Sequence, residues 1–160
     1  MIIVSDSGPI ISFARAGYLK LLGQLFQEII IPEAVYEEIA IIGIGRAGAK
    51  EVISGEWIKT KRTKNRLKVK QLPAMLGLGE REAIILAQEL NATLLIDDRK
   101  AREVAEENGI NCFGSLRVLK EAKDRKLIDA IKPVGDELIV TGLRIDSSLY
   151  QRFLQEVGES

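Results

Sequence analysis

The chain has 160 residues, 46% of them hydrophobic, and its 23 basic and 23 acidic side chains balance to a net charge of zero. This length predicts a single compact unit with a substantial core, and the composition excludes a disordered or collagen-like chain. No stretch of about eighteen apolar residues is present, and the N-terminus shows neither a basic leader nor a cleavage pattern, so we expect a cytoplasmic protein without membrane attachment.

The sequence contains no histidine and a single cysteine, Cys112. The absence of histidine excludes Ser-His-Asp and Cys-His nucleophilic machinery, histidine acid–base pairs and histidine-bearing zinc sites. A lone cysteine cannot form an internal disulfide, and we expect Cys112 to serve as a small, buried apolar side chain. Any catalysis must therefore use carboxylates, amines, hydroxyls or backbone groups.

Apolar segments of strand length alternate with segments of helix length. In chain order, the pattern predicts a strand at 2–4, a helix at 10–25, a strand at 29–31, a helix opened by Pro32, a strand near 57–58, a helix at 79–90, a strand at 93–96, a helix at 99–108, a strand at 110–113, and helices at 115–123, 132–141 and 147–157. This alternation predicts an α/β fold with a mainly parallel sheet covered on both faces. We expect residues 1–125 to form the domain and residues 126–160 to add a helical extension packed on it.

A run of cations without any acidic residue lies between Lys59 and Lys70. We call these seven residues the basic strip: Lys59, Lys61, Arg62, Lys64, Arg66, Lys68 and Lys70. Such a strip can neutralise several phosphates of a nucleic acid and release their counterions. A solvated loop, or an edge strand that lysines protect from unwanted pairing, would have the same composition.

Carboxylates follow two of the predicted strands, with Asp6 after the first and the pair Asp97 and Asp98 after the strand at 93–96. Ligands bind beyond the carboxyl ends of parallel strands, so these side chains can converge there. Four glutamates in two predicted helices can face the same crevice: Glu37, Glu38, Glu80 and Glu82. Clustered carboxylates need a neutralising cation, and their hard oxygens suit Mg²⁺ or Mn²⁺, which catalyse phosphodiester hydrolysis without histidine.

Each of these carboxylates also has a purely structural interpretation. Asp97 or Asp98 can cap the helix that follows, Glu80 and Glu82 can complement the dipole of theirs, and Glu37 and Glu38 can lie on a helix surface. The GxGxxG pattern at 43–48 trails a predicted helix instead of a strand, so it does not indicate a dinucleotide site.

Four segments, taken together, resemble those of PIN-domain proteins from Asp6 to about Phe113. They are Asp6-Ser7, Ile31-Pro32 with Val35-Tyr36-Glu37-Glu38-Ile39, Gly79-Glu80-Arg81-Glu82-Ala83-Ile84, and Leu94-Leu95-Ile96-Asp97-Asp98-Arg99. The resemblance, closest to a VapC-like prokaryotic subgroup with a helical tail, implies a three-layer α/β/α sandwich and a Mg²⁺- or Mn²⁺-dependent endoribonuclease. It also implies a role as the toxin of a toxin–antitoxin pair, with RNA as substrate, a cognate antitoxin as partner, and a homodimer.

By position, the resemblance makes Asp6, Glu38, Glu82 and Asp98 the catalytic, metal-binding acids. The resemblance also implies Asp97 as a further metal ligand, although the sequence does not separate the roles of Asp97 and Glu80 from those of their neighbours Asp98 and Glu82. The hydroxyl of Ser7 lies near the site, and Lys61, Arg62, Lys64, Arg66 and Lys68 of the basic strip are expected to bind the RNA backbone.

One position departs from the pattern, because Ile96 stands where many PIN proteins carry Thr or Ser. The lost hydroxyl favours a rival interpretation, in which the fold binds nucleic acid or a protein partner without cleaving RNA. A third interpretation is a metal-dependent phosphatase or nucleotide hydrolase that uses the same carboxylates on a smaller substrate. The basic strip favours a polymeric substrate over this alternative.

Overall fold

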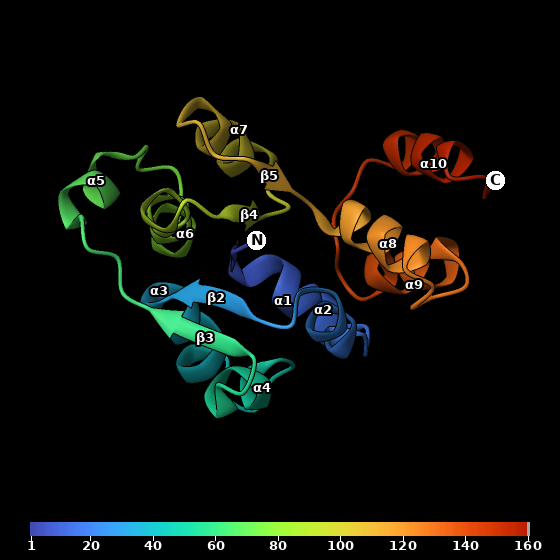
Figure 1. The fold of residues 1–160 in the computed structure, drawn as a ribbon, viewed down its shortest axis with the longest axis horizontal. Coiled ribbons are helices and arrows are strands. Elements are labelled where there is room, and N and C mark those ends of the chain that lie inside the picture. Colours follow the sequence, from blue (N-terminus) through green and yellow to red (C-terminus); the bar gives the residue numbers. More distant parts are fainter. Residues whose placement is uncertain (160) are drawn as a thin grey trace.

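Five parallel strands form one central sheet in the computed structural model, which describes residues 1–159 (Figure 1). In chain order the strands are β1 (Ile3–Ser5), β2 (Ile29–Pro32), β3 (Ile58–Lys61), β4 (Thr93–Leu95) and β5 (Cys112–Phe113). Their spatial order is β3-β2-β1-β4-β5. The chain thus builds one half of the sheet outward from β1, returns, and builds the other half from β4, so the strand order reverses between β1 and β4.

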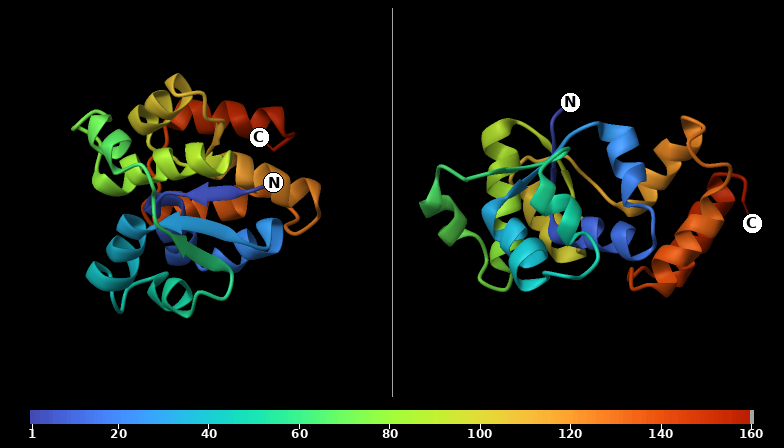
Figure 2. Two further views of the ribbon diagram at one scale, coloured as in Figure 1. Left: turned by 60° about the vertical axis from the view of Figure 1, so that its left-hand side comes forward. Right: turned by 90° about the horizontal axis from the view of Figure 1, so that it is seen from below.

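Helices cover the sheet on both faces (Figure 2). They are α1 (Ser7–Arg15), α2 (Leu19–Phe26), α3 (Glu33–Tyr36), the π-helix η1 (Glu37–Ile42), α4 (Ala49–Ser54), α5 (Arg66–Gln71), α6 (Leu78–Leu90), α7 (Arg99–Glu107), α8 (Ser115–Asp124), α9 (Ile131–Val140) and α10 (Ser147–Glu156). None of the helices within residues 1–159 is long and apolar enough to cross a membrane. The predicted α/β class and α/β/α layering are confirmed.

The strands supply apolar side chains to two separate clusters, one on each face of the sheet. Val4 of β1 and Leu94 of β4 pack with α6 and α7, whereas their neighbours Ile3 and Leu95 pack with α1, α2 and the C-terminal helices. Successive strand residues point to opposite faces, so a strand buried on both sides must be apolar throughout. This explains why β1, β2 and β4 appear in the sequence as short, mostly apolar runs, whereas the edge strand β3 is exposed except at Ile58.

The helix predicted at 10–25 is wrong as a single element. The structure has two helices there, α1 and α2, and Gly17 lies between them with a φ of +82°, in the left-handed region that favours glycine. The helix opened by Pro32 also changes type, because α3 continues as η1. Gly43 ends η1, and a Cβ at this position would lie 2.7 Å from the Ile39 carbonyl oxygen, so the close approach requires glycine.

Two features lie at the edges of the sheet. The basic strip begins in β3 and ends in α5, a helix that the sequence pattern did not predict. At the opposite edge, Cys112 on β5 is half-buried, and burial raises the pKa of its thiol to about 11, so the side chain stays neutral at physiological pH as an apolar role requires.

The C-terminal helices pack on the face that α1 and α2 cover. Ile131 and Leu138 of α9 and Leu154 of α10 are fully buried in the same apolar cluster as Phe13 and Leu22. The extension is therefore continuous with the core on this face, and the division at residue 125 stays a prediction.

Candidate active site

Carboxylates gather beyond the carboxyl ends of the central strands, at the point where the strand order reverses. Asp6 directly follows β1, Asp98 follows β4, Glu38 lies in η1 and Glu80 lies in the first turn of α6. In open parallel sheets this is the position at which ligands bind. The sheet topology therefore brings side chains from four distant parts of the sequence to one crevice.

Asp6 is the most deeply buried acid of this group, with 7% of its surface exposed. Burial raises its pKa to about 7, and the nearby Glu80 and Glu38 act in the same direction, against the backbone amides of Ser7 and Gly8. Within residues 1–159, its buried Oδ1 has no hydrogen-bond partner. A buried carboxylate oxygen without a partner is costly, and a cation at this point would remove the cost.

Glu38 is held beside Asp6 by two local contacts. The Ser7 hydroxyl donates a 2.7 Å hydrogen bond to Glu38 Oε2. The other oxygen of Glu38 approaches Gly79 at the start of α6 so closely that any side chain at residue 79 would displace it. Ser7 therefore orients the Glu38 carboxylate and Gly79 leaves room for it, which gives physical reasons for the Asp-Ser and Gly-Glu pairs in the sequence.

Glu80 faces the same crevice from α6. Its Oε1 accepts a 3.0 Å hydrogen bond from the Gly77 amide, closing the first turn of the helix. Burial raises the pKa of Glu80, as do the charges of Asp98 and Glu38, while the Gly77 hydrogen bond opposes the shift. Glu80 is thus repelled electrostatically by Asp98 and Glu38, and it acts in the same way on Asp6.

Glu82 is placed differently, although the sequence resemblance made it a catalytic acid. It is buried, and both of its oxygens have partners: Oε1 accepts from the Ala34 amide at 3.0 Å and Oε2 forms a 3.0 Å ion pair with Arg66. Glu80 and Glu82 are two residues apart on a helix and so cannot face the same way. The structure directs Glu80 to the other acids and Glu82 to the start of α3.

The two aspartates after β4 also have different surroundings. Asp98 is exposed and caps α7, where its Oδ1 accepts from the Ala101 amide at 2.9 Å. Asp97 has both oxygens occupied by Ser115, whose amide donates to Oδ1 at 2.8 Å and whose hydroxyl donates to Oδ2 at 2.5 Å. Asp97 therefore ties the end of β4 to α8, and Asp98 is the aspartate that contributes to the charge around Glu80.

Ile96, the position at which the sequence departs from the PIN pattern, is fully buried among apolar side chains below α6 and α7. Its backbone carbonyl accepts a 3.2 Å hydrogen bond from Arg102. The GxGxxG segment at 43–48 follows η1 instead of a strand, as the sequence indicated, and so lacks the context of a dinucleotide site.

The basic strip lies at the β3 edge of the sheet and continues past the carboxyl end of that strand. Two of the five cations expected to bind RNA are engaged within the protein: Arg62 pairs with Glu33 at 3.4 Å, and Arg66 pairs with Glu82. Lys61, Lys64 and Lys68 are exposed and form no ion pair within the described residues. The strip and the acids thus share one end of the sheet, which suits a charged polymer that spans both.

The donor set at this crevice is chemically suited to Mg²⁺ or Mn²⁺, because it consists of carboxylate and hydroxyl oxygens and includes the unpartnered Oδ1 of Asp6. Among residues 1–159, no three carboxylates already lie close enough together to form a complete ion-binding group. The acids are therefore neighbours in one crevice whose mutual repulsion is not neutralised.

The sequence could separate Glu80 from Glu82 only in part. Helical periodicity indicates that only one of these two glutamates can face the site, but it does not indicate which one. Choosing between them requires the orientation of α6 on the sheet. Choosing between Asp97 and Asp98 requires the position of Ser115, which is contributed by a later helix.

A comparison with solved structures supports the fold. A PilT N-terminus domain protein from the hyperthermophilic archaeon Sulfolobus solfataricus P2 superposes with a TM-score of 0.55 at 16% identity, over 91% of this chain and 98% of that one. A domain of a functionally unknown protein from Methanocaldococcus jannaschii DSM 2661 gives a TM-score of 0.44 at 24% identity, over 70% of this chain and 89% of that one. No curated protein matches significantly in sequence.

A sequence model of the family DUF3368, described as a PIN domain, matches residues 2–159. The match covers both the sheet domain and the C-terminal helices. The PIN domain is a nuclease-type fold, and PIN domains typically use divalent metal ions. The chain therefore belongs to the PIN-domain family.

Proposed function

We propose that this protein is a metal-dependent endoribonuclease that cleaves RNA phosphodiesters at the crevice beyond β1 and β4. Asp6, Glu38, Glu80 and Asp98 would hold Mg²⁺ or Mn²⁺, directly or through water. Held by these residues, the ion would supply Lewis-acid activation of a water molecule and neutralisation of charge on the phosphate. The proposal also includes what the family resemblance implies, namely a toxin of a toxin–antitoxin pair, a cognate antitoxin and a homodimer, together with the cytoplasmic location expected from the sequence.

The observation that carries the proposal is the state of Asp6. A buried acid with an unpartnered oxygen and a raised pKa is expensive to maintain, and such residues cluster at functional sites. Ser7 and Gly79 also support the proposal, because Ser7 binds a second acid, Glu38, beside Asp6 and Gly79 leaves room for it. A purely structural role explains neither the unpartnered oxygen nor the repulsion among the acids.

The residues of the chain have separate roles in this proposal. Ser7 orients the Glu38 carboxylate through its hydroxyl, and Gly79 leaves room for it. Glu82 is a positioning residue, since it holds the Ala34 amide at the start of the α3–η1 segment that carries Glu38. Lys61, Lys64 and Lys68 bind the phosphates of the RNA, while Arg66 contributes mainly through its pair with Glu82.

Substitutions at the acids test the proposal. Cleavage of a labelled single-stranded RNA in Mn²⁺ is measured for the wild type, Asp6→Asn, Glu80→Gln and Glu82→Gln, with the folded state of each verified by circular dichroism. We expect Asp6→Asn to slow cleavage by about 100-fold or more, because it removes an oxygen ligand at the reacting centre. Glu80→Gln should slow cleavage more than Glu82→Gln does, whereas Glu82→Gln should lower the melting temperature more.

Specific outcomes contradict the proposal. An unchanged cleavage rate in Asp6→Asn would remove the mechanism. A larger rate loss in Glu82→Gln than in Glu80→Gln, without loss of stability, would restore Glu82 to the metal site. Binding of the RNA without cleavage in both Mg²⁺ and Mn²⁺ would select the rival interpretation, a binding protein with a PIN fold, which the buried Ile96 favours.

A further inference from the structure

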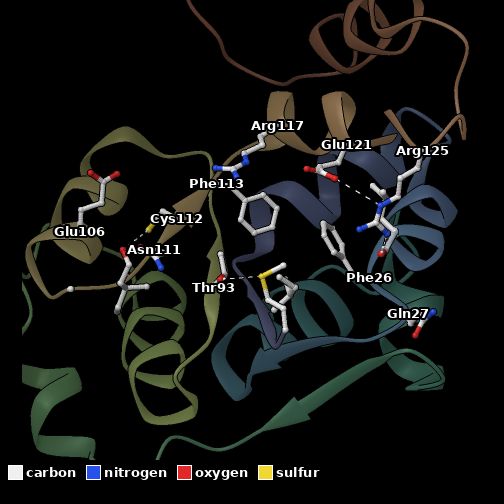
Figure 3. A pocket seen from close by; sticks show the side chains of 15 residues that line it. Phe26, Gln27, Thr93, Glu106, Asn111, Cys112, Phe113, Arg117, Glu121 and Arg125 are labelled. Atoms are coloured by element: carbon white, nitrogen blue, oxygen red, sulfur yellow. Dashed lines mark hydrogen bonds and ion pairs between the residues drawn. The ribbon is translucent and has the colours of Figure 1, made fainter. Parts of the chain in front are cut away.

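A groove of about 860 Å³ adjoins the acidic crevice on the side away from the basic strip. It is lined by the start of α7, the end of β5, α8, the α9–α10 connection and α10. A second pocket of about 1000 Å³ shares Cys112, Phe113, Arg117 and Glu121 with it and continues along β5 toward the amino ends of the strands (Figure 3). The two hollows together follow the β5 edge of the sheet.

Three arginines in this groove form no ion pair with a carboxylate among residues 1–159: Arg102, Arg117 and Arg144. Other cations at the groove do, since Arg99 pairs with Glu103 and Lys120 with Asp124. Two arginines from different elements, Arg117 on α8 and Arg144 in the α9–α10 connection, are thus exposed and available to an anionic ligand.

Three acids line the same groove, and each has a partner within the protein; Glu121 pairs with Arg125 at 3.8 Å. Both oxygens of Asp97 accept hydrogen bonds from Ser115, and Asp146 caps α10 by accepting from the Leu149 amide at 2.9 Å. The amide and hydroxyl groups that donate to Asp97 and Asp146 are neutral and leave the carboxylate charges in place. The five cations that line the groove outnumber its three acids, so the groove carries a net positive charge, which favours an anion.

Arg102 is fixed at the head of the groove, where it meets the ends of β4 and β5. Its Nη2 donates to the carbonyls of Ile96 and Asp97 at 3.2 and 3.4 Å, and its buried Nε has no hydrogen-bond partner within residues 1–159. Gly114 permits this placement, because a Cβ there would lie 2.9 Å from Nη2. The Asp97 carboxylate lies near this guanidinium but forms no ion pair with it within residues 1–159.

Aromatic and aliphatic side chains lie beside these cations. Phe113 and Phe153 line the groove, and Leu149 is 47% exposed there. Figure 3 shows Arg117 next to the Phe113 ring, which also packs edge-on against Phe26 with their centroids 5.7 Å apart. Proteins that hold single-stranded nucleic acid without sequence preference combine two features: cations that bind the phosphates, and aromatic or apolar side chains beside them that contact the bases.

The groove also has the right position relative to the acids. Asp97 lines its head, and the next residue, Asp98, belongs to the acidic crevice. The basic strip approaches the same crevice from the β3 edge, and the groove approaches it from the β5 edge. Cations therefore flank the acids toward both edges of the sheet. A chain of phosphates that crosses the carboxyl ends of the strands would meet one basic surface on each side.

Resting on the proposed nuclease function, we propose that this groove binds the part of a single-stranded RNA that lies on one side of the cleaved phosphodiester. Arg117 and Arg144 contact its phosphates, Arg102 contacts the phosphate nearest the acids, and Phe113 and Leu149 contact bases. The C-terminal helices thereby become part of the substrate-binding surface.

The test measures RNA binding apart from cleavage. Binding of a fluorescein-labelled mixed-sequence RNA 20-mer is followed by anisotropy in metal-free buffer across a series of KCl concentrations, for the wild type and the double variant Arg117→Ala/Arg144→Ala. The control is Lys20→Ala/Arg46→Ala, which removes the same charge from exposed positions outside both basic surfaces. All three proteins are also assayed for RNA cleavage in Mn²⁺.

We expect the groove variant to bind the RNA roughly tenfold more weakly than the control does. The slope of the logarithm of its binding constant against the logarithm of the KCl concentration should be shallower by about 1.4, since each of the two lost phosphate contacts on a single strand contributes about 0.7. An affinity and slope equal to those of the control would overturn the groove, even if the wild type cleaves RNA. Weakened binding by the groove variant, when the wild type does not cleave, would support the groove and reject the nuclease function alone.

Discussion

Two carboxylates of this protein, the buried Asp6 and the half-buried Glu159, have opposite surroundings. Glu159 accepts hydrogen bonds from the Ile131 and Lys132 amides, both at 2.9 Å, and pairs with the Lys123 ammonium at 2.7 Å. Asp6 has an oxygen with no partner among the described residues, and its charged neighbours are other acids. Glu159 thus satisfies the hydrogen-bond donors around it, whereas Asp6 keeps an oxygen that the surrounding structure leaves without a partner.

The pKa values of the two groups shift in opposite directions. Burial raises the pKa of Asp6 to about 7, and repulsion by Glu80 and Glu38 adds to the shift. Burial alone would raise the pKa of Glu159 as well, but the hydrogen bonds from Lys123, Ile131 and Lys132 outweigh it and lower the pKa. The difference indicates that Glu159 stabilises the fold, whereas Asp6 costs stability unless a cation is bound.

The largest effect is expected from Asp6→Asn in metal-free buffer. Because the folded pKa of Asp6 lies above the unfolded value of about 3.9, its favourable contribution is complete below that value and is lost as the pH rises through about 7. At pH 8, Asp6→Asn should increase the free energy of unfolding by roughly 4 kcal/mol, and at pH 4 it should change little. Urea unfolding at both pH values measures the difference.

The control for that experiment is Asp129→Asn, at an exposed aspartate in the turn before α9. It should leave stability unchanged at both pH values. Equal stability of Asp6→Asn and the wild type at pH 8 would mean that the Asp6 carboxylate has partners in solution and that the contrast with Glu159 is wrong.

An intermediate effect, opposite in sign, is expected from Glu159→Gln. The substitution removes the ion pair with Lys123 and weakens the cap of α9, so the free energy of unfolding should fall by about 2 kcal/mol at pH 7. Because the folded pKa of Glu159 is lowered, this contribution is present above the unfolded pKa and is lost as the pH falls through the folded one. The deficit should therefore shrink in acid.

Glu156→Gln, at an exposed position of α10, serves as the matched control in thermal unfolding at pH 7. A destabilisation as small as that of the control would show that the contacts of the Glu159 carboxylate contribute nothing to the free energy of unfolding. A deficit that grows in acid would reverse the sign assigned to Glu159.

The smallest effect is expected from Gly79→Ala, which alters the acidic crevice without altering a charge. An added methyl group would displace the Glu38 carboxylate, the mobile end of a flexible side chain, while alanine favours the helix in which residue 79 lies. Stability should be unchanged or slightly increased, and Mn²⁺-dependent RNA cleavage should fall by about tenfold, equivalent to about 1.4 kcal/mol. Full activity in this variant would show that the position of Glu38 does not matter.

Much of the fold was predictable because its signals are local. The central strands β1, β2 and β4 are short, mostly apolar runs since both sheet faces are covered there, and α6 is apolar over Ala83–Ala87 because it packs on the sheet. The break between α1 and α2 was missed although Gly17 marks it, because a glycine within an apolar helical pattern does not by itself reveal a left-handed backbone. The π-helix η1 has no recognised sequence signal.

The candidate site was predictable in its residue types but not in all its members. The sequence alone determined that the chain carries an acidic set without histidine, a basic strip and an α/β order of elements, since these follow from composition and periodicity. The tertiary structure alone decided that Glu80 faces the other acids while Glu82 binds Arg66, and that Asp97 is occupied by Ser115. Partners of this kind come from segments far apart in the chain, and only the packing of helices on the sheet determines which of two neighbouring carboxylates meets them.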